Sequence, residues 1–197
     1  MYQYSREDIA KKISLSGINP GSPSAFAVLL DPGTLAVLVY RFGRFAKNVR
    51  LPVVGHLLKI LYFVCFYLIQ MLTGISIQAY ADIGPRFVVM HFSCVFVLAE
   101  KVGSDFTVYE GVTVGNIRGK SRLPIIGNNV TLEAGCKVLG DVTIGDNVVV
   151  RANSLVLSDI PSNSIALGNP ARHTPMKQDI NNSDRTEIQH SLKQEII

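Results

Sequence analysis

The chain is poor in cysteine and in charged side chains, and each shortage excludes a class of protein. Its three cysteines, Cys65, Cys94 and Cys136, are far apart and lie in apolar contexts, which argues against a disulfide framework or a zinc site. Only 17% of the residues are charged, so intrinsic disorder is excluded outside a polar C-terminal stretch. The N-terminus lacks a long apolar run, so we expect no signal peptide. These features predict a folded protein of a reducing cytoplasm.

The charge balance is mildly basic. Nineteen Lys and Arg residues against fifteen Asp and Glu residues give a net charge of +4, scattered along 197 residues. This charge is too mild and too dispersed to indicate nucleic acid as a partner. It favours a phosphorylated cofactor, an acidic glycan or an anionic lipid. The chain is also 48% hydrophobic, which indicates contact with a membrane surface or large subunit interfaces.

Residues 1–73 have the apolar spacing of helices. Ser5 precedes acidic residues and predicts the N-cap of a first helix. The tripeptide DPG at 31–33 predicts a break between two later helices. We therefore expect an N-terminal helical region.

The most apolar helical segment is 51–72, with Pro52 in its first turn. Its length is close to the ~20 residues that a membrane span needs, although His56 and Lys59 lie inside it. Three interpretations are open: a buried helix at a subunit interface, a helix lying on a membrane surface, and a true span.

Residues 74–172 repeat with a period of six, which is neither helical nor a simple strand alternation. Such a period predicts a solenoid in which three short strands and three corners form one coil, with roughly five coils in all. Asn, Asp and Gly residues lie between the apolar positions and tolerate the left-handed backbone of tight corners. The apolar positions that share one frame are Val102, Val108, Val114, Ile126, Leu132, Val138, Ile144, Val150 and Val156. An earlier run, Ile77, Ile83, Val89 and Val95, is offset by one residue. Residues 173–197 are polar without a period and are expected to be a tail.

The units IGPRFV, VGSDFT, IGNNVT and IGDNVV resemble those of the hexapeptide-repeat acyltransferases, and GNPAR at 168–172 resembles their closing signature. The order of DPG, TGISIQAYADIG and FTVYEGVTVG is similar to that of the serine acetyltransferase branch. ISIQAYADIG and GVTVGN resemble the colanic-acid or exopolysaccharide type. The resemblance implies a mainly β fold, a left-handed parallel β-helix after the helical region. It also implies a homotrimer and acetyl-CoA as co-substrate.

His91 stands where the resemblance places the catalytic histidine of this family. A neutral imidazole can take the proton of a hydroxyl that attacks a thioester, which makes His91 the candidate general base. The alternative is an imidazole that only satisfies a backbone carbonyl. Glu100 is a candidate to orient the ring, and a solvated corner charge is its alternative.

Three residues depart from the serine acetyltransferase pattern. Met90 stands where that branch has Asp, Ser76 where it has a carboxylate, and Leu123 where it has a loop histidine. These losses favour a sugar or oligosaccharide acceptor, in a surface polysaccharide or its lipid-linked precursor. The enzyme would then work in the cytoplasm at the inner face of the membrane, with peripheral contact through 51–72. The alternatives are a serine acetyltransferase and a non-catalytic β-helix that serves as an assembly module.

For the cofactor, the resemblance implies contacts from small corner residues and from basic side chains. Ala134 and Ala152 match the alanines along the pantetheine arm, although repeat geometry also favours small residues there. Lys137 and Arg172 are candidates for the CoA phosphates, with plain surface charge as the alternative. Gly115 and Asn116 open a basic loop at 117–124 that would clasp the cofactor or an acidic glycan, or is simply solvated.

Overall fold

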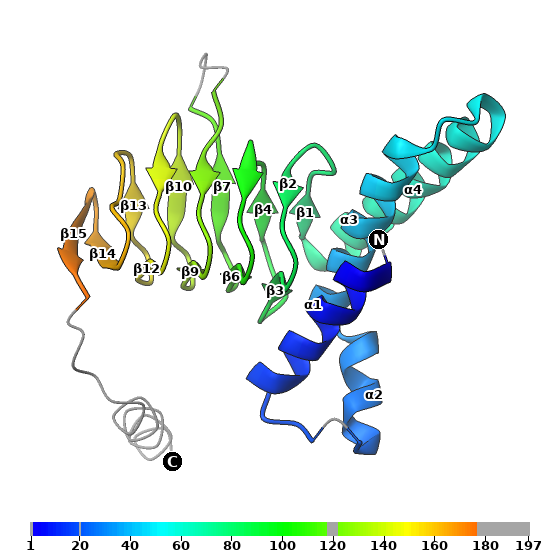
Figure 1. The fold of residues 1–197 in the computed structure, drawn as a ribbon, viewed down its shortest axis with the longest axis horizontal. Coiled ribbons are helices and arrows are strands. Elements are labelled where there is room, and N and C mark those ends of the chain that lie inside the picture. Colours follow the sequence, from blue (N-terminus) through cyan, green and yellow to red (C-terminus); the bar gives the residue numbers. More distant parts are fainter. Residues whose placement is uncertain (1, 20, 118–121, 177–197) are drawn as a thin grey trace.

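The computed structural model describes residues 2–19, 21–117 and 122–176. Within these residues, helices come first and a coil of short strands follows (Figure 1). The predicted helical region and the break at Asp31 are confirmed, since Asp31 accepts a hydrogen bond from the Thr34 amide as the N-cap of α3. The helices are α1 (Tyr2–Leu15), α2 (Pro23–Leu30), α3 (Pro32–Asn48) and α4 (Pro52–Thr73).

The strands form three sheets, one for each side of the coil, and every pairing but the last is parallel. Sheet A holds β1 (Ser76–Ile77), β4 (Phe96–Val97), β7 (Thr113–Gly115), β10 (Lys137–Leu139) and β13 (Leu155–Val156). Sheet B holds β2 (Asp82–Ile83), β5 (Lys101–Val102), β8 (Ile125–Ile126) and β11 (Thr143–Ile144). Sheet C holds β3 (Val88–Val89), β6 (Thr107–Val108), β9 (Thr131–Leu132), β12 (Val149–Val150), β14 (Ser164–Gly168) and the antiparallel β15 (Ala171–Pro175).

Consecutive strands visit sheets A, B and C in turn, so the predicted three-sided solenoid is confirmed. In its later coils Lys137 pairs with Leu155 and Ile125 with Thr143, a step of 18 residues. The step from Thr113 to Lys137 is longer because the loop after β7 is extruded between them. The period of six is therefore one side of a triangular coil.

The corners have the left-handed backbone that their residue types predict. Asn129, Asn147 and Asn153 have φ values of 51°, 55° and 58°. The side chains of Asn129 and Asn147 also form a ladder, with Nδ2 of one 2.9 Å from Oδ1 of the next. Asp141 was expected to take the same conformation, but Gly140 takes it instead at φ 91° because glycine has no Cβ to clash.

The repeating aliphatic residues fill the interior of the coil, as predicted. The frame residues are at most 2% exposed, and the offset run is at most 3% exposed. Phe87 and Phe106 stack on one another in the same interior at 5.4 Å between ring centroids. Burial of this single aliphatic column is the main source of stability for the coil.

The glycine of the I-G repeat is required where one coil lies on the next. A Cβ on Gly103 would stand 2.7 Å from the carbonyl carbon of Gly127, and one on Gly84 would stand 2.8 Å from that of Gly103. These contacts are with backbone atoms, which cannot move aside as a side chain can. The repeat therefore keeps glycine at this corner because the backbones approach too closely for any other residue.

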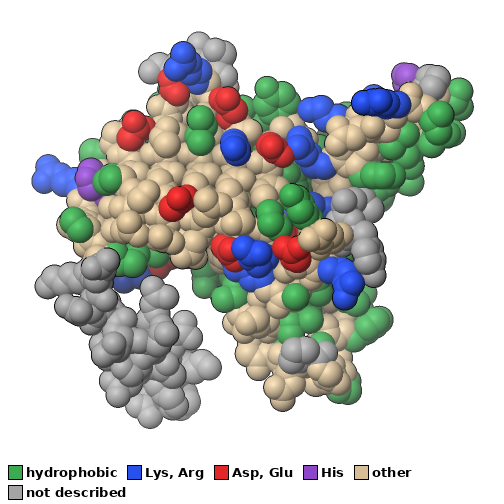
Figure 2. All heavy atoms as spheres, in the orientation of Figure 1, with side chains coloured by type: hydrophobic (Ala, Val, Ile, Leu, Met, Phe, Trp, Pro, Cys, Tyr) green, Lys and Arg blue, Asp and Glu red, His purple; other side chains and the backbone are tan. Residues whose placement is uncertain are grey.

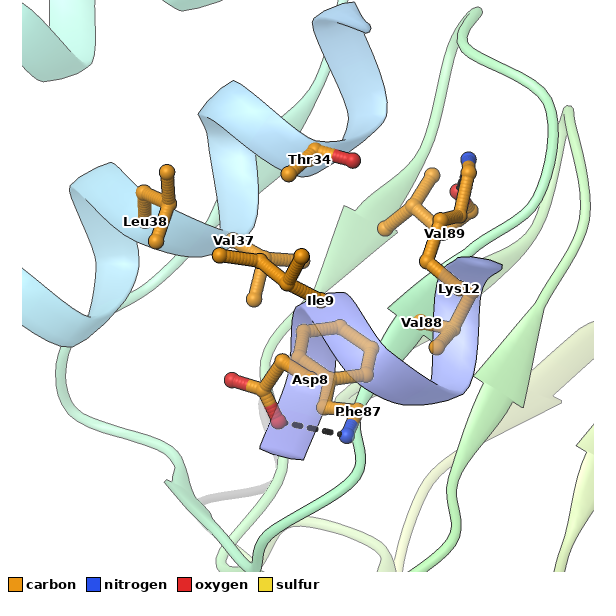
Figure 3. A pocket seen from close by; sticks show the side chains of 9 residues that line it. All are labelled: Asp8, Ile9, Lys12, Thr34, Val37, Leu38, Phe87, Val88 and Val89. Atoms are coloured by element: carbon orange, nitrogen blue, oxygen red, sulfur yellow. Dashed lines mark hydrogen bonds between the residues drawn. The ribbon is translucent and has the colours of Figure 1, made fainter. Parts of the chain in front are cut away.

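The helices α1 and α3 pack against the first coil, close to β3 (Figures 1 and 3). Asp8 of α1 accepts a hydrogen bond from the Phe87 amide at 2.8 Å and forms a buried ion pair with Arg41 of α3. Arg41 also donates to the Ile83 and Gly84 carbonyls. A buried charge is tolerated only when it is paired in this way, so these contacts fix α1, α3 and the coil to one another.

Two details differ from expectation. Ser5 lies inside α1, because the helix begins at Tyr2 and the Tyr4 ring packs under the Arg41 guanidinium at 5.1 Å. Pairing also continues past residue 172, since β15 reaches Pro175. The rest of the predicted tail, 177–197, lies outside the described residues.

We predict that Gly103→Ala destabilises the protein by about 1–3 kcal/mol, because the new methyl group would force the Gly127 backbone away. Urea unfolding followed by circular dichroism measures the change. Gly21→Ala is the matched control, since a Cβ there meets nothing within 4 Å. Equal stability of the two variants would contradict the account of the repeat.

Candidate active site

One edge of the coil, where sheet C turns into sheet A, carries most of the predicted site residues. In sheet C, Val89 pairs with Val108, Val108 with Leu132, and Leu132 with Val150. The residues two positions after each of these therefore stack in one column along the edge. We name this edge the His91 edge, and its column is His91, Glu110, Ala134 and Ala152.

His91 and Glu110 form a hydrogen-bonded pair in adjacent coils. His91 Nδ1 lies 3.0 Å from Glu110 Oε2, and the two side chains are 64% and 43% exposed. A carboxylate can only accept, so Nδ1 carries the proton and Nε2 of the neutral ring keeps its lone pair. The Tyr109 ring meets the imidazole edge to face at 5.6 Å. The pair thus presents an accessible, oriented base.

The backbone that carries His91 is held from behind by α1. Lys12 donates from Nζ to the Met90 carbonyl at 2.9 Å and also to the Val89 carbonyl, and it forms an ion pair with Asp31 at 3.0 Å. Figure 3 shows Lys12 beside Val89 at the end of α1. The main chain just before the base is therefore fixed by a buried ammonium group.

Glu110 was missed by the sequence analysis, which named Glu100 instead. Glu100 is an exposed residue just before β5, where its amide donates to the Pro124 carbonyl, so the structure favours the solvated alternative for it. The signal for Glu110 was the offset run in the sequence. Val89 and Val108 are 19 residues apart rather than 18, and the same step from His91 leads to Glu110.

The predicted cofactor residues Ala134, Ala152 and Lys137 all lie at or beside the His91 edge. The Ala152 amide already donates to Glu133 Oε2 at 3.0 Å, and the Ala134 carbonyl accepts from Asn153. Lys137 Nζ donates to the Gly111 and Gly135 carbonyls at 3.0 and 3.2 Å. Small side chains thus leave the edge shallow between Glu110 and Ala152.

The other predicted cofactor residues lie elsewhere. Gly115 ends β7 and Asn116 follows it, at the edge where sheet A turns into sheet B. Arg172 is exposed in β15, at the far end of the coil. Residues 118–121 of the predicted clasp lie outside the described residues. Within one chain, the predicted set therefore divides among three places.

The ionisable groups around the base form a mixed environment. Arg151 pairs with Glu133 at 2.7 Å, one position before Ala152 and Ala134 on the same edge. Burial raises the pKa of Tyr109, with a smaller contribution from the charges of Glu133 and Glu110. Burial also raises the pKa of Cys136 to about 12, so this thiol is not a nucleophile at neutral pH.

Comparison with known proteins identifies the family. The description "Bacterial transferase hexapeptide (six repeats)" matches residues 124–158. The serine acetyltransferase of Helicobacter pylori is 37% identical over 149 residues, which cover 74% of this chain and 82% of that protein. The chain belongs to the hexapeptide-repeat acyltransferase family. This membership confirms the predicted activity class, an acetyl-CoA-dependent acyltransferase, with acetyl-CoA as co-substrate.

Further relatives of this hexapeptide-repeat acyltransferase come from two branches. The putative colanic acid biosynthesis acetyltransferase WcaB of Escherichia coli is 41% identical over 147 residues, covering 69% of this chain and 86% of that protein. The crystal structure of Neisseria gonorrhoeae serine acetyltransferase in complex with serine matches with a TM-score of 0.70 and 26% identity, covering 87% of this chain and 68% of that one. Serine acetyltransferases dominate the relatives, so the predicted placement nearest to the colanic-acid type is not favoured over the serine branch.

We predict that neutral His91 is protonated on Nδ1, because Glu110 accepts from that nitrogen. Nitrogen-15 NMR of the imidazoles at alkaline pH reports which nitrogen carries the proton, with the exposed His173 as an internal reference. Glu110→Ala should return His91 to the tautomer of His173. An Nε2-protonated ring in the unmodified protein would contradict the assignment.

Proposed function

We propose that this enzyme transfers the acetyl group of acetyl-CoA to an acceptor hydroxyl, with His91 as general base and Glu110 as the residue that positions it. His91 Nε2 accepts the hydroxyl proton while the oxygen attacks the thioester carbonyl. The imidazolium then returns the proton to the departing thiolate, so the ring ends neutral. The supporting observation is the hydrogen bond of 3.0 Å between Nδ1 and Glu110, which leaves Nε2 as the accepting nitrogen.

The His91 edge suits a long, narrow co-substrate. Ala134 and Ala152 continue the column above Glu110 and present no bulky side chain. A pantetheine arm along this column would bring its thioester to His91. Lys137, Arg172 and the loop that begins at Gly115 and Asn116 remain our candidates for the CoA phosphates and adenine end.

The division of these residues among three places supports a homotrimer. A neighbouring coil that packs beside the His91 edge would bring its own loop or its own Arg172 toward the base. Closed threefold symmetry fits a solenoid with three flat sides. The hexapeptide match and the likeness to serine acetyltransferases also support left-handed winding of the coil.

For the acceptor, the comparisons favour a small molecule with a hydroxyl, and serine comes first. The relative that shares 82% of its length with this chain and the solved structure with bound serine are both serine acetyltransferases. A sugar hydroxyl is the second candidate, and two observations favour it. The WcaB relative is 41% identical, and Ser76, Met90 and Leu123 stand where the serine branch has polar groups.

We predict that His91→Asn lowers kcat by at least about a hundredfold, because a positioned base contributes about 10²–10⁴-fold. Glu110→Ala should lower kcat by about tenfold or more while the KM for acetyl-CoA stays unchanged, since Glu110 acts only through His91. Thiol release from acetyl-CoA gives both constants. Glu100→Ala is the matched control, an exposed carboxylate beside β5, and should retain full activity. Near-normal turnover by His91→Asn would remove His91 from its role.

We predict that serine supports thiol release above the rate of acetyl-CoA hydrolysis. The same assay with hexoses and with an exopolysaccharide oligosaccharide tests the second candidate. Mass spectrometry of the product shows a gain of one acetyl group on the acceptor. If serine is silent and the oligosaccharide is acetylated, the acceptor is a sugar and the serine assignment is wrong.

A further inference from the structure

Helix α4 presents an unusually apolar outer surface. It is the one helix among the described residues that is long and apolar enough to cross a membrane, and only 17% of its most apolar window is buried. Its inner side packs on α3 through Tyr62, Phe66 and Gly55. Twelve large apolar residues of the segment 51–72 are at least 45% exposed. They are Leu51, Val53, Val54, Leu57, Ile60, Leu61, Phe63, Val64, Tyr67, Leu68, Met71 and Leu72.

These residues form one continuous face. At 3.6 residues per turn, Val53, Leu57, Val64 and Met71 point away from α3, and the others flank them. His56, Lys59 and Gln70 fall together on one flank beside the α3 contact rather than in this face. We name the twelve residues the α4 outer face. Patches of this size are rare on the free surface of a soluble protein and mark a site of contact.

The charges around the α4 outer face all have the same sign. No Asp or Glu occurs from residue 32 to residue 81, whereas this stretch holds Arg41, Arg44, Lys47, Arg50 and Lys59. Lys47 and Arg50 are exposed near the turn between α3 and α4, and Lys59 is exposed two turns into α4. Figure 2 shows hydrophobic side chains along this arm with basic ones at its tip. The arm is therefore complementary to a surface that is both apolar and negatively charged.

We propose that the α4 outer face lies on an anionic phospholipid bilayer, with its apolar side chains among the acyl chains and Lys47, Arg50 and Lys59 at the phosphates. A helix of this kind binds through apolar burial and through attraction to anionic headgroups. The helix lies in the plane of the membrane and does not span it. The inner side of α4 is occupied by α3, where Gly43 allows the Tyr62 ring to approach too closely for any larger residue.

A second copy of the chain fits this face less well. In a twofold contact, the same patch of each copy would meet, so the cations of the two arms would be brought together. The arm has no acidic residue between 32 and 81 with which to neutralise them. A bilayer rich in anionic lipid supplies that charge, and it also buries the whole length of α4.

The experiment is sedimentation of the full-length protein with vesicles. We expect binding to an equimolar mixture of phosphatidylglycerol and phosphatidylcholine and weaker binding to phosphatidylcholine alone. Added salt should weaken the binding to the anionic vesicles, because it screens surface charge. Arg50→Glu with Lys59→Glu should lower the partition into anionic vesicles by at least about tenfold, since each cation near the surface contributes about fivefold.

Leu57→Asp with Val64→Asp tests the apolar part of the face. Both residues are more than half exposed, so the fold should survive, and circular dichroism checks this. The double variant should lose at least about tenfold in partition into anionic vesicles, because it places charge within the buried face. The matched control is Leu157→Asp with Leu167→Asp, two exposed leucines of the β-helix, which should bind as the unmodified protein does.

Two results would overturn the proposal. The first is that the unmodified protein sediments with neither kind of vesicle. The second is that light scattering shows self-association, which Leu57→Asp with Val64→Asp abolishes, while vesicles are not bound. In that case the occupant of the face is a second copy. Vesicle binding does not depend on the acceptor or on His91, so this test stays separate from the activity assays.

Discussion

The close stacking of one coil on the next is the constraint on which the rest of the structure depends. At Gly84, Gly103 and Gly127 the backbone of one coil lies against that of the next, with room for hydrogen only. The buried aliphatic column and the asparagine ladder hold the same spacing from the inside and from another edge. Because the coils cannot slide past one another, each corner residue has a fixed neighbour in the next coil.

This fixed register turns positions in the sequence into contacts at the site. A step of 18 residues from His91 leads to Tyr109, and a step of 19 leads to Glu110. The pairing of Val89 with Val108 selects 19, so a carboxylate lies at the outer ring nitrogen and Tyr109 packs against the ring from the side. A shift of one residue between the two coils would exchange these partners. The base and its orienting group thus depend on an irregularity in the repeat rather than on the repeat itself.

The sequence therefore predicted the architecture better than the site. The repeat, the buried frame, the corner asparagines and the helix at 52–73 follow from patterns of residue type, and the structure agrees with them. Glu110 was not found because the offset of one residue was noted without being applied to His91. Lys137 was assigned to phosphate, but its ammonium group caps two corner carbonyls, a competition that charge alone does not reveal. The start of α1 at Tyr2 depends on packing with Arg41, which no local signal encodes.

The helical region and the site are mechanically one unit. Lys12 of α1 holds the carbonyls just before His91, and Asp31, its ion-pair partner, caps α3. Arg41 of α3 joins Asp8 of α1 to the first coil, and α4 packs along α3. A surface that binds α4 therefore sets the orientation of α3, of the first coil and of the His91 edge together. In the proposed arrangement on a bilayer, the base would keep a fixed direction relative to the membrane, and acceptors held at that membrane would meet it from one side.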